Sequence, residues 1–139
     1  MYKTTAAIVA ERIIVDKATN KASLIDTYDE ISSQSFPISL QTTGFFFLIA
    51  RTNTDAPSFT ATTSIKLDNI VLFQQDMAVD FHNGLIARVM LNFQGLTIPS
   101  AGTLTATIKQ KDSEIGQASV IVKRLDLPPF SIAVDQSTN

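Results

Sequence analysis

The chain has 139 residues, a formal net charge of −2 and no cysteine. At this length we expect one domain whose core needs no covalent cross-links. The lack of cysteine excludes disulfides, thiolate catalysis and zinc sites built from cysteine, and the eleven Lys and Arg residues are scattered along the chain without a basic stripe, which argues against nucleic acid as a partner.

The apolar runs are too short to suggest a membrane partner. The N-terminal run ends at Ala10, before Glu11 and Arg12, and the longest later run is Phe45 to Ala50. A signal-peptide core needs about 7–15 apolar residues and a membrane-spanning helix about 20. We therefore expect no contact with a membrane and predict a cytoplasmic location.

Two strands joined by a hairpin loop are predicted at the start of the chain. Ala6 to Asp16 and Ser23 to Ile31 are both rich in β-branched and apolar residues. The loop between them, Lys17 to Lys21, contains Asn20, which tolerates left-handed backbone geometry. The stretch that follows, Ser32 to Thr43, is polar and irregular, and its proline cannot donate a hydrogen bond to a neighbouring strand. We interpret it as a crossing segment or a sheet edge.

A strand that is apolar on both faces is predicted at Gly44 to Asn53. Because side chains alternate across a strand, one face consists of Phe45, Phe47 and Ile49, and the other of Phe46, Leu48 and Ala50. Only one set can fill a core between two sheets, so the other needs a second cover. We predict that the second set is the interface of a homodimer, and the alternative cover is the chain's own tail around Pro128 to Val134.

The second half of the chain shows regular alternation of apolar and polar residues. The predicted strands there are 59–67, 70–81, 88–94, 103–109 and 118–123. The spacing of three and four that a helix requires is missing. Asn83-Gly84 predicts a type I′ hairpin turn, and Pro99 to Gly102 and Asp112 to Gly116 predict two further reversals.

Eight strand candidates without helical periodicity predict an all-β, two-sheet antiparallel sandwich of seven to eight strands, with little or no helix. We expect this domain to occupy residues 1–124. The C-terminal extension, residues 125–139, contains Pro128-Pro129, a stiff extended pair. After it, residues 130–134 alternate and predict a last strand, and residues 135–139 are predicted to be disordered.

Few residues suggest catalysis or metal binding. His82 is the single histidine, so a Ser-His-Asp site would have to use it. Because it precedes the predicted Asn83-Gly84 turn, we expect an exposed, non-catalytic side chain. Asp68, Asp76 and Asp80 could each donate oxygen ligands to calcium, but the chain lacks the density of ligands that a calcium loop needs. We expect no catalytic residue, no metal and no cofactor.

One polar cluster is a weak candidate for a ligand or hydrolytic site. Asp26 and Glu30 would share one face of the predicted strand at Ser23 to Ile31, close to Tyr28. Paired carboxylates can serve as general acid and base. A pocket lined by these three residues would favour such a site.

Two segments resemble a known family. They are AERIIVDKATNKASLIDTYDEI with SFP, at residues 10–31 and 35–37, and LNFQGLTIPSAGTLTATI, at residues 91–108. Together they resemble a bacterial family of small uncharacterised proteins with a single immunoglobulin-like β-sandwich domain, over Ala10 to Lys123. The resemblance implies an immunoglobulin-like sandwich and no activity. The chain departs from true immunoglobulin domains because it lacks their cysteine pair and core tryptophan.

Three functions are compatible with these observations. The first is a non-enzymatic interaction domain that binds protein partners and itself, which the doubly apolar strand favours. The second is a small-ligand-binding or hydrolytic domain that uses the loop carboxylates. The third is a structural subunit of a larger bacterial or phage assembly whose tail is donated to a neighbour.

Overall fold

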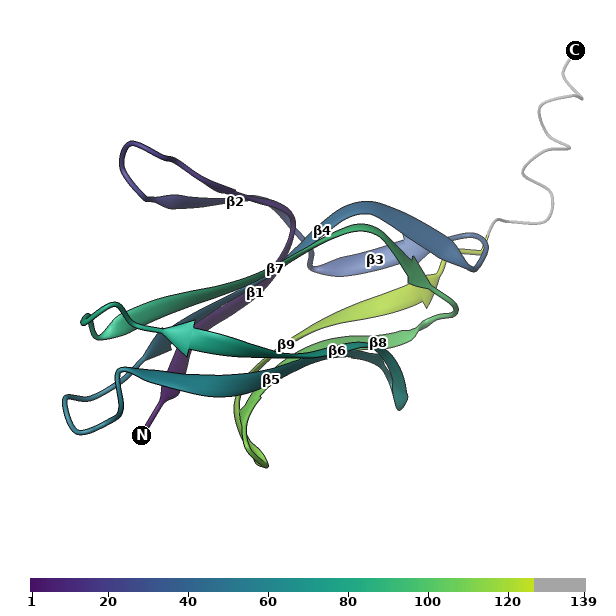
Figure 1. The fold of residues 1–139 in the computed structure, drawn as a ribbon. Helices are drawn as coiled ribbons and strands as arrows, with labels where there is room; N and C mark the ends of the chain where they lie inside the picture. The colour runs from purple at the N-terminus through teal and green to yellow at the C-terminus, as the bar shows by residue number, and fades with distance from the viewer. Residues whose placement is uncertain (127–139) are drawn as a thin grey trace, which may run out of the picture.

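A computed structural model describes residues 1–126, and all the regular structure in that range is β (Figure 1). The strands are β1 (Lys3–Val15), β2 (Ala22–Thr27), β3 (Glu30–Ser33), β4 (Ile38–Ala50), β5 (Ser58–Leu67), β6 (Ile70–Asp80), β7 (Ile86–Ile98), β8 (Gly102–Gln110) and β9 (Ser113–Arg124). The predicted all-β class without helix is confirmed for these residues, with nine strands instead of seven to eight.

The strands form two layers. The first sheet has the order β2-β1-β4-β7 and the second the order β3-β9-β8-β5-β6, and the two are stacked face to face (Figure 1). The predicted two-sheet sandwich is therefore confirmed. The prediction of purely antiparallel pairing is wrong at one place, because β3 runs parallel to β9. This happens because the chain leaves the first sheet after β2 and enters the second sheet beside the end of β9.

Two predicted boundaries change. The single strand expected at 23–31 is split, since β2 and β3 belong to different sheets and Tyr28-Asp29 crosses between them. The stretch from Ser32 to Thr43 is not a crossing segment or an edge throughout, because β4 begins at Ile38 and lies between β1 and β7. Pro37 precedes this strand directly, so its missing N–H removes no hydrogen bond from within β4.

Left-handed residues mark the turns. Asn20 has a φ of 57° in the loop between β1 and β2, as predicted. In the turn after β6 the positive φ values belong to His82 and Asn83, at 49° and 65°, and the Gly84 N–H donates to the Phe81 carbonyl over 2.8 Å. The type I′ turn thus lies one residue before the predicted position. It carries the chain from the second sheet to the first and does not close a hairpin within one sheet.

The core lies between the two sheets and follows the alternation seen in the sequence. Its fully buried large side chains include Phe45, Phe47, Ile49, Ile65, Leu67, Ile98, Leu104, Ile108, Val120 and Val122. Each comes from the inward face of its strand, which is what period-two patterning requires. The inward face of the doubly apolar strand β4 is therefore the one that carries Phe45.

The chain reaches the end of the described residues beside β3. After β9, the Leu125 N–H donates to the Ser33 carbonyl over 2.8 Å. The predicted strand at 130–134 and the predicted disorder of 135–139 lie outside the described residues. Within residues 1–126 there is no helix with the length and apolar character needed to cross a membrane.

Candidate functional site

The second apolar face of β4 is the face predicted as an interface. Phe46 lies on it and is only 6% exposed, while Leu48 and Ala50 are half-buried. Since these side chains point away from the core, something on the outer side of the first sheet must cover Phe46. The structure shows a cover that the sequence did not suggest, which is the chain's own hairpin.

This hairpin, residues 11–27, is here called the arm. β1 pairs with β4 as far as Ala10 and with β2 from Ala10 onward. Past this point the arm folds back over the side of the first sheet that faces away from the second sheet (Figure 1). The arm is therefore a continuation of the sheet that turns over its own outer face.

Two contacts fix the arm on that face. A Cβ placed on Gly44 would lie 2.7 Å from Cδ1 and from Cγ1 of Ile13, so the missing side chain of this glycine lets the arm come close. At the arm's tip the Arg88 guanidinium donates to the Asn20 carbonyl. In the pairing of β4 with β7, Gly44, Phe46 and Leu48 are opposite Asn92, Met90 and Arg88. Phe46 thus lies between the two contacts and beneath the arm.

The arm leaves one end of the face open. Ile86 is 52% exposed and lies opposite Ala50 in the pairing of β7 with β4, and its neighbour Leu85 is 46% exposed. Leu48 and Ala50, both half-buried, adjoin them on β4. These four residues, Leu48, Ala50, Leu85 and Ile86, are called the open patch below. The sequence shows two consecutive apolar residues, Leu85 and Ile86, directly after the turn. It does not show that they lie beside β4, because that depends on the pairing of β7 with β4.

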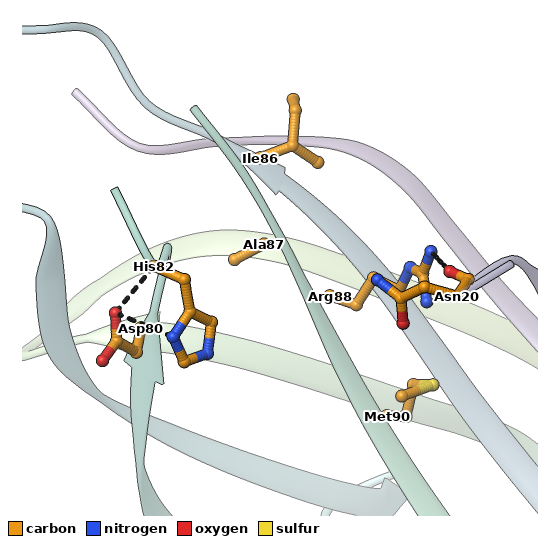
Figure 2. Close-up of a pocket in the computed structure, with 7 residues that line it drawn as sticks. All are labelled: Asn20, Asp80, His82, Ile86, Ala87, Arg88 and Met90. Carbon is orange, nitrogen blue, oxygen red and sulfur yellow. Dashed lines mark hydrogen bonds and ion pairs between the residues drawn. The ribbon is translucent and has the colours of Figure 1, made fainter. Parts of the chain in front are cut away.

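An open hollow of about 420 Å³ borders the patch. It is lined by Asn20, Asp80, His82, Ile86, Ala87, Arg88 and Met90. Figure 2 shows the Asp80 and His82 side chains on one side of it and the Arg88–Asn20 contact on the other. The hollow therefore lies between the tip of the arm, β7 and the turn that precedes β7.

The hollow has few side chains that are suited to catalysis. His82 Nδ1 is 3.9 Å from Asp80 Oδ1, and the two side chains are 86% and 57% exposed. The Asp80 carboxylate also accepts a hydrogen bond of 2.8 Å from the His82 backbone N–H. No Ser, Thr, Cys or Lys side chain is among the seven lining residues, so the hollow offers no hydroxyl, thiol or amine nucleophile of the kind that covalent catalysis uses.

The structure divides the predicted polar cluster between the two sheets. Asp26 lies in β2 of the first sheet and Glu30 lies in β3 of the second sheet, so the two carboxylates do not share a strand face. Glu30 forms an ion pair of 2.9 Å with Lys123. Tyr28 is half-buried, and burial raises the pKa of its phenol, with a further rise from the carboxylates of Glu11 and Asp26. Asp26, Tyr28 and Glu30 are not among the lining residues of four hollows in the described part of the chain.

A carboxylate elsewhere is strongly stabilised in its charged form. Asp55 accepts a hydrogen bond of 2.5 Å from the N-terminal amine of Met1 and two from Thr52, through its backbone N–H and its hydroxyl. The hydrogen bond from the amine, followed by that from the Thr52 N–H, lowers the pKa of Asp55 to about 2. Together these contacts tie the start of β1 to the loop after β4.

Partly buried apolar side chains also lie along the side of the sandwich, where β6 and β7 face each other. The inward-facing Phe73 and Met77 of β6 and Phe93 of β7 are only half-buried. The rings of Phe73 and Phe93 meet edge to face with centroids 4.9 Å apart. These three residues are called the seam. Among residues 1–126 there is no group of three or more His, Asp or Glu side chains placed to hold a metal ion.

Comparisons with known proteins bear on the family and add no activity. The model of a family of unknown function, DUF6941, matches residues 5–123, and a comparison with curated proteins gave no match. A solved structure described as an immunoglobulin-like protein from Pseudomonas aeruginosa is similar, with 10% sequence identity and a TM-score of 0.40, over 88% of this chain and 96% of that one. The resemblance predicted for Ala10 to Lys123 thus falls on an uncharacterised family, as expected.

Proposed function

The chain belongs to the family of unknown function DUF6941, and we propose that it is a non-enzymatic interaction domain that binds protein, beginning with a second copy of itself. The open patch carries this proposal. Leu48, Ala50 and Ile86 lie together on the outer face of the first sheet, with Ala50 opposite Ile86 in the pairing of β4 with β7, and the exposed Leu85 directly precedes Ile86 in the chain. Grouped apolar exposure of this kind marks interaction surfaces more often than isolated exposed residues do.

Burial of the open patch by a bound protein would be energetically favourable. Fully burying an aliphatic side chain the size of Ile or Leu contributes about 1.5–3 kcal/mol. Leu85 and Ile86, each about half exposed, would supply part of this amount, and Leu48 and Ala50 would add the remainder of their exposed surface. In a two-fold dimer the same patch is used twice, so the contribution doubles. The interface predicted from the sequence, Phe46, Leu48 and Ala50, is thereby shifted by one strand toward β7, with Phe46 serving the arm.

Hydrolytic or ligand-binding activity has less support. Its proposed carboxylates, Asp26 and Glu30, lie in different sheets, and Glu30 is paired with Lys123. The hollow beside the open patch has no hydroxyl, thiol or amine side chain among its lining residues, and its Asp80 and His82 side chains are exposed. We also propose a cytoplasmic location, which the cysteine-free sequence supports.

Sedimentation velocity over a range of concentrations tests the proposal. Ile86→Asp places a charge in the open patch, and Ile70→Asp is the matched control because Ile70, at the start of β6, is exposed to a similar degree, 54% against 52%. We expect the unsubstituted chain and Ile70→Asp to form a dimer at tens of micromolar, and Ile86→Asp to remain a monomer. A monomer at every concentration, or equal behaviour of the two variants, would overturn the assignment.

A further inference from the structure

The edges of the two sheets differ in how well they are protected against the pairing of a further strand. Within residues 1–126 the terminal strands are β2 and β7 in the first sheet and β3 and β6 in the second. β2 and β3 have only 6 and 4 residues, and β6 carries Asp76 and Asp80. Short length and charge both discourage pairing at an edge. β7 has 13 residues, no proline and a single charged side chain, Arg88, so it is the least protected edge.

The pairing of β7 with β4 decides which backbone groups of β7 face its free edge. In an antiparallel pair, opposite residues alternate between pairs that exchange two hydrogen bonds and pairs whose N–H and C=O groups point away from each other. The Arg51 N–H donates to the Leu85 carbonyl over 3.0 Å, which makes these two residues a hydrogen-bonded pair. The next pair, Ala50 with Ile86, is therefore of the other kind, and the register continues from it without a shift.

The free backbone groups of β7 open onto the hollow described above. By the same alternation, the residues at the start of β7 whose N–H and C=O groups point away from β4 are Ile86, Arg88 and Met90. All three line the hollow of about 420 Å³, whose other side is formed by Asp80 and His82 (Figure 2). Its volume lies in the range of about 300–1,000 Å³ that is usual for binding pockets. The unpaired backbone groups and the space for a partner thus coincide.

The side chains of these three residues lie on the outer face of the first sheet, with Arg88 in the middle. In an antiparallel strand added to β7, the residues opposite them would place their side chains on the same face. Ile86 is 52% exposed and Met90 is half-buried, so apolar side chains opposite them would become buried. The Arg88 guanidinium donates to the Asn20 carbonyl, and within residues 1–126 no carboxylate forms an ion pair with it. A carboxylate opposite Arg88 would supply that missing charge.

The charges around the hollow favour an acidic segment over a second copy of β7. The tip of the arm beside Arg88 carries the exposed Lys17 and Lys21 and one carboxylate, Asp16. Asp80, the acidic residue that lines the hollow, lies across from Arg88. A second β7 that paired in antiparallel fashion over the same residues would place the partner's Arg88 opposite Arg88. Like charges in opposite positions destabilise a strand pair.

We propose that the edge of β7 binds an extended segment of another protein as an added antiparallel strand. In that segment an acidic residue lies opposite Arg88, and apolar residues two positions before and after it lie opposite Ile86 and Met90. Main-chain hydrogen bonds supply affinity in this kind of recognition, and alternate side chains select the sequence. The site goes beyond the proposed self-association, because it uses the strand edge and a partner that is not a second copy. Only Ile86 belongs to both surfaces.

Residue-resolved hydrogen exchange on the full-length chain tests whether the edge is free. The amides of Ile86, Arg88 and Met90 should exchange rapidly, and those of Ala87 and Val89, which are bonded to β4, should exchange slowly and serve as controls on the same strand. Slow exchange of the first three at every concentration would mean that the chain's own residues 127–139 cover the edge. Slow exchange only at high concentration would mean that a second copy covers it. Either result would overturn the proposal.

A peptide of sequence TVTETVT, acetylated and amidated at its ends, is the probe for binding. Its glutamate suits Arg88, and its two valines suit Ile86 and Met90. Titration followed by NMR should show saturable binding with a dissociation constant below about 1 mM, and the amides of these three residues should become protected. TVTKTVT should bind about fivefold more weakly, because a like-charge pair replaces an opposite-charge pair. No saturable binding of TVTETVT in this range would overturn the proposal.

Methylation of single peptide nitrogens distinguishes strand pairing from other modes of binding. A methyl group on the glutamate nitrogen removes an N–H that faces β7, whereas one on the nitrogen of the threonine that follows removes an N–H that faces away. The first should weaken binding about tenfold and the second by less than about threefold, because only the first removes a hydrogen bond. Equal losses would refute an added strand.

Arg88→Gln tests the assigned charge contact. The variant loses the positive charge and keeps an N–H donor for the Asn20 carbonyl, so the arm should stay in place, which circular dichroism and the exchange of Ala87 and Val89 verify. TVTETVT and TVTKTVT should then bind within about twofold of each other. A preference for the glutamate peptide that survives Arg88→Gln would refute the role of Arg88.

These outcomes are distinct from those of the proposed self-association. If the chain is a monomer at every concentration and TVTETVT binds with the expected pattern, the dimer is refuted and the edge site stands. If Ile86→Asp abolishes a dimer and TVTETVT does not bind the unsubstituted chain, the open patch remains the interface and the edge site is refuted.

Discussion

The cover that the arm provides for Phe46 makes a quantitative prediction. Phe46 is 6% exposed, and Leu48 on the same face is half-buried. Phe46→Ala should destabilise the fold by about 3–5 kcal/mol, as expected for a large-to-small change at a buried site. Leu48→Ala should cost less, about 1 kcal/mol, because part of the Leu48 side chain is already in contact with water.

The arm should be responsible for the difference. Ile13 is the arm residue that approaches Gly44 most closely, two residues from Phe46 on the same face of β4. Ile13→Ala should loosen the arm and lower the cost of the subsequent Phe46→Ala change. A double-mutant cycle of the two substitutions should give a coupling free energy of about 0.5–3 kcal/mol, the range for side chains in contact. Ile70→Ala, at the start of β6 in the second sheet, should couple to Phe46→Ala by less than about 0.5 kcal/mol.

Urea unfolding followed by far-UV circular dichroism measures these values. The measurement belongs well below the concentration at which the chain dimerises, because binding of a partner to the folded state raises apparent stability. If Phe46→Ala costs no more than Leu48→Ala under these conditions, or if Ile13 and Phe46 show no coupling, then the arm does not shield Phe46 in solution. The face predicted from the sequence would then again be free for a partner.

Three further outcomes are expected. The folded-state pKa of Asp55 is lowered to about 2, so its contribution to stability is present above its unfolded pKa of about 3.9 and is lost as pH falls toward 2. Urea unfolding at pH 5 and at pH 2.5 should therefore show that the free energy of unfolding falls less between these pH values for Asp55→Asn than for the unsubstituted chain. Gly116→Ala should cost about 1–3 kcal/mol, since its Cβ would lie within 2.7 Å of the Thr4 Cβ, and Thr4→Ala in the same chain should recover part of that loss in the same assay. His82→Ala should change the free energy of unfolding by no more than about 0.5 kcal/mol, because its side chain is 86% exposed; a large loss would mean that the turn depends on the imidazole.

The strands in the second half of the chain were predictable because each has one inward face. Leu104, Ala106 and Ile108 were expected on one side of a strand, and all are at most 1% exposed. The alternation of Val120 and Val122 with polar neighbours is equally direct, and both are buried. In such strands period two in the sequence and burial in the structure have the same cause.

The first half was harder to predict because its strands change partners along their length. β1 pairs with β4 up to Ala10 and with β2 beyond it, and no glycine or proline marks the change. The break at Tyr28-Asp29 between β2 and β3 likewise lacks a turn dipeptide. Both depend on which strand lies alongside in space. The open patch could not be predicted from the sequence for the same reason, since Ile86 and Ala50 become neighbours only when β7 pairs with β4.

The doubly apolar strand therefore does not imply that its whole outer face binds a partner. Ile13 and Asn20 place the arm over the half of the face that carries Phe46. Arg88, which contacts the tip of the arm, is opposite Leu48, and Ala50 and Ile86 lie beyond this pair. The remaining apolar surface is at one end of the outer face, while the seam lies beside the edge of β7.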